Sequence, residues 1–260
     1  MFLFKFFYIF SLLFSICIIF YLLKSWCFFC KVYIRIYLYK WIYNMNMDRH
    51  IPVTFSDKFA KKVTRLLRWC ADTFFAKRYG HRAIVLETVA AVPGMVSGVF
   101  MHFKSLRSMQ MGYGPKLREM LAEAENERMH LMTFIQIAQP SKFERILVIF
   151  AQFIFIFFYS LLYIFFPKTA HRLTGYFEEE AVISYTEYLS LVENGTIENT
   201  PAPQLAIDYW NLDTYAKLSD VIIAIRKDEM HHRDTNHKFA EEKLNSKNFK
   251  DLENSIPEKK

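Results

Sequence analysis

The chain has 260 residues, a length that suits one large domain or two small ones and is sufficient to bury a hydrophobic core. Apolar residues make up 53% and include 27 phenylalanines, which excludes a disordered chain, while 7 glycines and 8 prolines exclude collagen-like sequences. The net charge of +7 is unevenly spread, because residues 1–86 hold 14 Lys and Arg against 3 Asp and Glu. Apolar runs interleave with these cations, so the charge favours an anionic membrane surface over nucleic acid as partner.

The first uncharged run covers residues 6–23, is 18 residues long and is followed by basic residues. Its length reaches the minimum for a membrane-spanning helix, and the basic residues place the following chain on the positive-inside face. A secretory signal is disfavoured because no small-residue cleavage site follows. We predict that residues 1–54 form an apolar, basic membrane anchor or targeting segment. Whether residues 6–23 are cleaved, span the bilayer or lie on it is left open.

The rest of the chain has a helical pattern without a convincing alternating strand run. Long stretches of good helix formers predict helices at residues 83–103, 117–138, 173–192 and 205–244. The Pro93-Gly94 pair predicts a kink or local break in the first of them. Residues 146–166 are a second uncharged run of 21 residues, which either spans the bilayer or lies against it. Residues 245–260 are polar, and we predict a frayed tail.

Acidic residues occur in segments that are otherwise apolar. Glu87 is the only charged residue between Arg82 and Lys104. A bare carboxylate on a buried helix face is costly, so Glu87 requires a cation, a proton or a metal ion unless it lies at the surface.

Two Glu-x-x-His motifs, Glu127 with His130 and Glu229 with His232, each place a carboxylate and an imidazole on one helical face. Together with Glu87 and Glu178, they give the four helices a repeated order: a lone glutamate, then Glu-x-x-His. This is the ligand pattern of ferritin-like di-iron bundles, in which carboxylates neutralise two iron ions. The alternative is four solvated acidic faces with unrelated histidines. Glu179 and Glu180 are interpreted as flanking surface groups or as a second layer around the site.

A ferritin-like bundle requires one long crossover between its second and third helices. The 34 residues from 139 to 172 are long enough for it and contain the second apolar run. The predicted fold is therefore all-α: a ferritin-like four-helix bundle over residues 55–244, with additional membrane-facing helices that lie in the interface as in a monotopic protein. An apolar run beside a metal-binding bundle predicts a substrate drawn from the bilayer.

Four ordered motifs resemble the signatures of the alternative oxidases, the membrane-bound di-iron ubiquinol oxidases of the respiratory chain. They are LETVAAVPGM at residues 86–95, NERMHL at 126–131, FEEEA at 177–181 and DEMHHRD at 228–234. The third motif has Phe177 in place of the usual leucine, and the fourth has Met230 in place of the usual alanine. The resemblance extends from about residue 55 to residue 239.

The resemblance implies a role for each matching position. Two iron ions would be held by Glu87, Glu127, Glu178 and Glu229, with His130 and His232 as ligands or close neighbours. The catalytic tyrosines would be Tyr185 and Tyr209, each with a packing role as the alternative. The quinol would contact Arg68, Arg82, Leu86, Phe177, Ala181 and Ser184, although the two arginines also suit phospholipid head groups. Supporting residues around the metal site would be Asn126, His171, Trp210 and Asp228.

The resemblance also implies the function. We expect a cyanide-insensitive terminal oxidase that oxidises ubiquinol and reduces O₂ to water at a non-haem di-iron centre, without pumping protons. The alternatives are another membrane di-iron enzyme, such as a plastoquinol oxidase or a lipid hydroxylase, and a non-enzymatic iron-binding bundle. The expected partners are ubiquinol, O₂ and the lipid bilayer, and not nucleic acid; a homodimer is left open. The expected location is the mitochondrial inner membrane, or that of a relict mitochondrion.

Overall fold

The computed structural model describes residues 49–75, 79–109 and 111–242, which are helical apart from short connections. The elements are α2 (Phe55–Phe75), α3 (Tyr79–Ser108), the 3₁₀ turn η1 (Met111–Tyr113), α4 (Gly114–Ala138), α5 (Lys142–Phe165), α6 (Pro167–Glu193), α7 (Gln204–Trp210) and α8 (Leu218–Glu241). Within the described ranges the only strand-like pairing is one isolated bridge, between Pro201 and Lys217. The all-α prediction is confirmed. The apolar segment 6–23 and the tail 245–260 lie outside the described residues.

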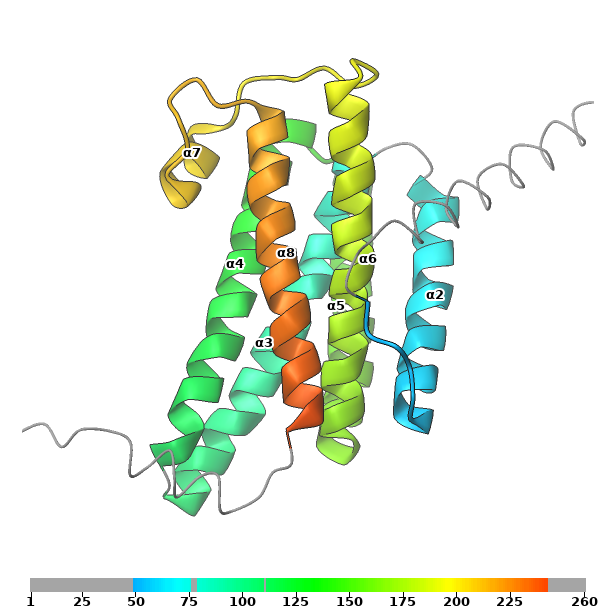
Figure 1. Ribbon diagram of the computed structural model, residues 1–260, viewed down its shortest axis with the longest axis vertical. Coiled ribbons are helices and arrows are strands. Elements are labelled where there is room, and N and C mark those ends of the chain that lie inside the picture. Colours follow the sequence, from blue (N-terminus) through cyan, green and yellow to red (C-terminus); the bar gives the residue numbers. More distant parts are fainter. Residues whose placement is uncertain (1–48, 76–78, 110, 243–260) are drawn as a thin grey trace, which may run out of the picture. The chain divides into compact units, whose positions relative to one another are not determined.

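Helices α3, α4, α6 and α8 form the four-helix bundle (Figure 1). The most extensive packing is between α6 and α8 and between α3 and α4. The apolar core between them includes Phe134 of α4, Tyr185 of α6 and Ile222 and Ile225 of α8, all of which are buried. Helix α2 covers α6 from outside, and α5 packs against α3 and α6.

The predicted long crossover is helix α5, which returns the chain to the end of the bundle where α4 begins, so that α6 runs parallel to α4 (Figure 1). The helix begins at Lys142 because Ser141 and Glu144 form a capping box: the Ser141 hydroxyl accepts a hydrogen bond from the Glu144 backbone N–H, and the Glu144 carboxylate accepts one from the Ser141 backbone N–H. The crossover is therefore a folded element rather than a loop.

One sequence-based expectation about helix continuity was wrong, and one was wrong in part. The predicted helix 205–244 is divided into α7 and α8, because Asn211 adopts a left-handed conformation (φ 51°) and ends α7. The Pro93-Gly94 pair was expected to kink or locally break the first helix; α3 is continuous through both residues, so the break does not occur. A Cβ atom at Gly94 would lie 2.6 Å from the Met120 carbonyl oxygen, so α3 packs closely against α4 directly after the proline.

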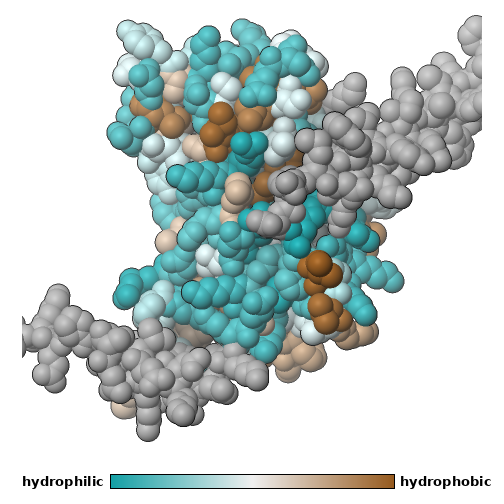
Figure 2. Space-filling view, viewed as in Figure 1, coloured by the Kyte–Doolittle hydropathy of each residue, from teal (hydrophilic) through white to brown (hydrophobic). Residues whose placement is uncertain are grey.

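Two helices, α3 and α5, are long and apolar enough to cross a membrane, but they differ in burial. In the most apolar part of α3, 61% of residues are buried, compared with 11% in α5. Helix α3 therefore belongs to the bundle core, whereas α5 has a broad exposed apolar face. The residues of this face are Phe143, Ile146, Ile149, Phe150, Phe153, Ile156, Phe157, Phe158, Ile164 and Phe165. Figure 2 shows a different face of the bundle, which is mainly hydrophilic.

Candidate metal centre

Each helix of the bundle contributes a buried carboxylate at the same level. Glu87 lies on α3, Glu127 on α4, Glu178 on α6 and Glu229 on α8, and none is more than 3% exposed. The three-residue spacing of each Glu-x-x-His motif turns the histidine toward the same interior. His130 is completely buried.

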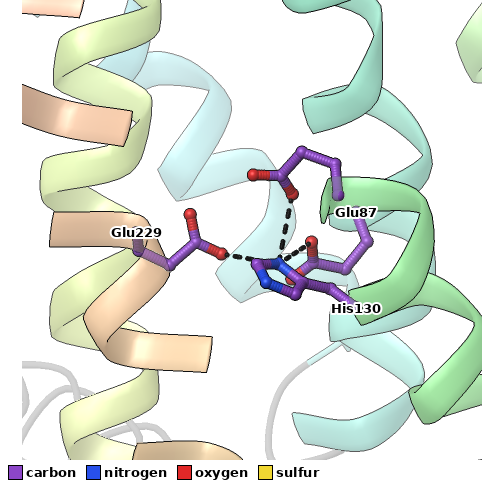
Figure 3. Close-up of side chains that lie close together, drawn as sticks. Glu87, His130 and Glu229 are labelled. Carbon is purple, nitrogen blue, oxygen red and sulfur yellow. Dashed lines mark ion pairs between the residues drawn. The ribbon is translucent and has the colours of Figure 1, made fainter. Parts of the chain in front are cut away.

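Four of these six side chains converge on one point. Glu87, Glu127, His130 and Glu229 each offer a ligand atom, and these atoms all lie within 4.8 Å of one another. His130 Nδ1 is 3.3 Å from a carboxylate oxygen of Glu87 and of Glu229, and 3.4 Å from one of Glu127. Figure 3 shows the side chains pointing toward one another from three helices.

The other two residues adjoin this group without belonging to it. His232 Nδ1 lies 2.7 Å from Glu127 Oε1 and 3.6 Å from Glu229 Oε2. Glu178 is buried beside Glu229, whose charge contributes to raising the pKa of Glu178. All six sequence-predicted metal residues thus occupy one interior region.

The donor atoms are placed better for binding metal ions than for hydrogen-bonding to one another. Both carboxylate oxygens of Glu127 and the Nδ1 atoms of His130 and His232 are buried, yet they form no hydrogen bond of acceptable geometry. Orphaned buried polar atoms are rare in folded proteins, and carboxylate with imidazole is the donor set that non-haem iron prefers. The residues present therefore suit a di-iron centre, with Glu127 and Glu229 on facing helices.

The electrostatics of the group point the same way. Burial, reinforced by the neighbouring carboxylates, raises the pKa of Glu87 and of Glu178 well above the usual range. Burial alone would lower the pKa of His130, but the charge of Glu127 and the hydrogen bond to Asp228 raise it well above the usual value. Several buried carboxylates without cations repel one another, so bound metal ions would relieve this repulsion.

The two predicted tyrosines lie in different surroundings. The Tyr185 hydroxyl donates a hydrogen bond to Glu87 Oε1, and its ring stacks on Phe134 at a centroid distance of 5.8 Å. Burial and the charge of Glu87 raise the pKa of Tyr185 well above its ordinary value, so the hydroxyl keeps its proton. Tyr209 is 41% exposed and accepts a hydrogen bond from the Asn126 amide. Only Tyr185 touches a metal residue directly.

Three of the four predicted supporting residues meet at a single carboxylate oxygen. Asp228 Oδ2 accepts hydrogen bonds from the Asn126 amide at 3.0 Å and from the Trp210 indole at 2.8 Å, and it lies 3.3 Å from His130 Nε2. Asp228 thereby orients the His130 ring. The fourth residue, His171, is not in this group and contacts Asn236 instead.

The comparison with known proteins decides the family. A family model described as alternative oxidase matches residues 37–241. The chain belongs to the alternative oxidase family.

Three relatives that the chain resembles are named mitochondrial ubiquinol oxidases. Ubiquinol oxidase 1c of Arabidopsis thaliana is 56% identical over 188 residues, which cover 72% of this chain and 57% of that protein. The enzyme of Batrachochytrium dendrobatidis is 56% identical over 191 residues, 74% of this chain and 60% of its own. The enzyme of Mangifera indica is 51% identical over 202 residues, 78% and 63% of the respective chains. The matched region thus spans about 60% of the length of these relatives.

In this member of the family, the residues predicted to contact quinol fall into a polar and an apolar part. The Ser184 hydroxyl accepts hydrogen bonds from Arg68 at 2.7 Å and from Arg82 at 2.6 Å, so α2, α3 and α6 meet at one hydroxyl. Leu86 lies one turn from Arg82 and is 37% exposed. The apolar part consists of Phe177 and Ala181, which precede Ser184 on α6 by seven and three residues.

The sequence analysis missed the carboxylates that hold these arginines. Asp72 binds both of them, at 3.0 Å from Arg68 Nε and 2.6 Å from Arg82 Nη1. Glu180 and Glu187 also pair with Arg68. The i,i+4 spacing of Arg68 and Asp72 is a usable signal, whereas the pairing across helices leaves no trace in the sequence. Glu179 and Glu180 are buried, so their interpretation as surface groups was wrong; Glu179 contacts His50 and His237, and Glu180 pairs with Arg68.

Proposed function

We propose that this protein is a ubiquinol oxidase that reduces O₂ to water at a centre of two iron ions, insensitive to cyanide and without proton pumping. The observation that carries the proposal is that three glutamates and one histidine meet at one point inside the bundle, with Glu178 and His232 buried beside them. Two quinols supply four electrons and four protons, which balance the reduction of one O₂ to two waters. When bound, the iron ions would supply the redox chemistry of O₂ reduction.

The residues of the protein bind the metal ions, orient the quinol and exclude water. The four glutamates and His130 would hold the iron ions, and His232 would adjoin them. Tyr185 holds its proton on the oxygen that faces Glu87, at the side of the centre nearest Ser184. Arg68 and Arg82, fixed by Asp72, would position a quinol head group against the Ser184 hydroxyl. Tyr209 lies farther from the metal residues than Tyr185, and it would affect them through Asn126, which contacts both Tyr209 and Asp228.

The exposed apolar face of α5 supports membrane association. A water-exposed patch of this size is unusual in a soluble monomer and is typical of a surface that enters the lipid interface. The relatives are named mitochondrial. We propose that this protein lies in one leaflet of the mitochondrial inner membrane and takes its quinol from the bilayer. A homodimer stays a prediction, which light scattering in detergent would check.

The test is oxygen uptake by the purified protein with a soluble quinol analogue and cyanide. Glu127→Ala and Glu229→Ala each remove a metal residue. Both variants should lose iron, and their rate of oxygen uptake should fall at least about 100-fold. Glu125→Ala is the matched control, because Glu125 lies on the same helix, is solvent-exposed and pairs only with Arg128 in the contacts observed. Unchanged uptake in Glu127→Ala, or active protein without iron, would refute the proposal.

A further inference from the structure

A second buried polar layer lies beyond the metal centre, on the side away from Tyr185 and the arginine pair. It consists of Glu123 on α4, Asn236 on α8 and His171 on α6, which are 6%, 3% and 3% exposed. Each residue is displaced by whole helical turns from a metal residue on its own helix. Glu123 precedes Glu127 by four residues, Asn236 follows His232 by four, and His171 precedes Glu178 by seven.

Asn236 connects the three helices. Its amide nitrogen donates to Glu123 Oε2 at 2.8 Å and to the His232 backbone carbonyl at 3.0 Å, and its amide oxygen lies 3.1 Å from His171 Nδ1. Both amide protons and the amide oxygen are therefore engaged. The side chain has one orientation that satisfies all three partners, and this orientation fixes α8 against α4 and α6 at this level.

The surroundings keep the layer rigid. The His171 ring packs edge-on against Tyr163 and Phe239, at centroid distances of 5.5 and 5.3 Å. Burial, with a smaller contribution from the charge of Lys116, lowers the pKa of His171 to about 3, so the ring is neutral and its Nδ1–H can donate to Asn236.

Sliding of α8 along α4 or α6 would break these bonds and leave buried polar groups unpaired, which is costly. An apolar layer would not impose this penalty, because methyl groups tolerate small shifts. A buried polar contact that selects one register is the best-attested use of such groups.

We propose that Asn236 is a positioning residue of the metal centre: with Glu123 and His171 it sets the axial register of α8, and thereby places Glu229 and His232 opposite Glu127. The inference rests on the proposed function only in naming the metal centre as the object that is positioned. None of the three residues needs to touch the metal.

The test measures metal binding without turnover. The full-length protein, stripped of metal, is titrated with Co²⁺, and the visible absorption of the bound ion is followed. Asn236→Leu, of similar volume but without hydrogen bonds, should bind Co²⁺ about 10- to 100-fold more weakly and shift the absorption band. The matched control is Thr174→Val, which removes another buried inter-helix hydrogen bond, that between Thr174 and Tyr159, without involving α8.

A second pair of variants separates geometry from charge and does not depend on the folding of Asn236→Leu. Glu123→Leu removes the acceptor of the Asn236 amide and should weaken Co²⁺ binding about tenfold, whereas Glu123→Gln retains an acceptor oxygen and should restore most of the affinity. In quinol turnover, Asn236→Leu should lower kcat and leave KM unchanged, because the arginine pair lies on the other side of the centre.

Wild-type Co²⁺ affinity and absorption in Asn236→Leu would overturn the proposal. The same holds if Glu123→Gln binds as weakly as Glu123→Leu, since the charge and not the hydrogen bond would then matter. A wild-type protein that binds two Co²⁺ ions but, reloaded with iron, does not oxidise quinol would refute the proposed function alone and leave this inference standing.

Discussion

At the scale of single residues, one tyrosine hydroxyl makes a direct contact with the candidate metal centre. Tyr185 donates to Glu87, and its ring stacks on Phe134. Tyr185→Phe retains the stacking and removes only the hydroxyl, so we expect the protein to fold and bind iron while kcat falls about 100-fold. Oxygen uptake and iron content measure the two effects separately.

The control for this prediction lies one turn further along α6. Tyr188 stacks on the same Phe134 ring, at 6.4 Å, but contacts no metal residue. Tyr188→Phe should therefore keep the wild-type rate. Equal losses in the two variants would show that packing, and not the Tyr185 hydroxyl, explains the effect.

The protonation of His171 predicts a pH dependence of stability. Its folded pKa of about 3 lies below the ordinary value near 6.5, so the unfolded state binds more protons between these values and the folded state loses stability as the pH falls. Between pH 7 and pH 5 this single group should cost about 2 kcal/mol.

His171→Phe fills the same aromatic surroundings without a titrating group. The free energy of unfolding of the metal-free protein, measured with urea at both pH values, should fall by about 2 kcal/mol less in His171→Phe than in the wild type. Parallel changes in the two proteins would contradict the assignment of a neutral buried His171.

At the scale of elements, the approach of α3 to α4 depends on one glycine. A Cβ at Gly94 would lie 2.6 Å from the Met120 carbonyl oxygen and 3.0 Å from the Ala124 backbone nitrogen. Gly94→Ala should therefore separate the helices and destabilise the protein by about 1–3 kcal/mol, although alanine is the better helix former. Urea unfolding measures the change.

Gly114, at the start of α4, provides the comparison. A Cβ there meets only Arg118 Nη1, at an ordinary contact distance of 3.5 Å. Gly114→Ala should leave the free energy of unfolding unchanged or raise it slightly. If both alanine variants behave alike, the close approach at Gly94 does not limit the packing.

At the scale of the whole molecule, the apolar face of α5 predicts how the protein meets the bilayer. Phe153 lies in this face and is 74% exposed, while Tyr215, in the connection between α7 and α8, is 88% exposed. Tryptophan introduced at position 153 should be quenched by brominated phospholipids in reconstituted vesicles. Tryptophan introduced by Tyr215→Trp should not, and equal quenching at both positions would exclude α5 as the lipid-facing side.

Much of the candidate site is predictable from the sequence because its signals are local. A glutamate and a histidine three residues apart share a helical face whatever the fold, and their repeated order identifies the four bundle helices. The long crossover follows from the distance between the second and third helices. Helix ends and breaks were predicted less well: the left-handed residue Asn211 divides the last predicted helix, and α3 is continuous through Pro93.

The sequence by itself determined the candidate metal residues, their order along the chain and the resemblance to the family, since each depends on spacing within one helix or on a motif. The tertiary structure decided how far each apolar helix is covered: 61% of the most apolar part of α3 is buried, compared with 11% in α5, because burial depends on what packs around the helix. It also decided the pairing of Asp72 with two arginines and the layer at Asn236. These contacts join residues of different helices, and such distances are fixed only when the helices pack.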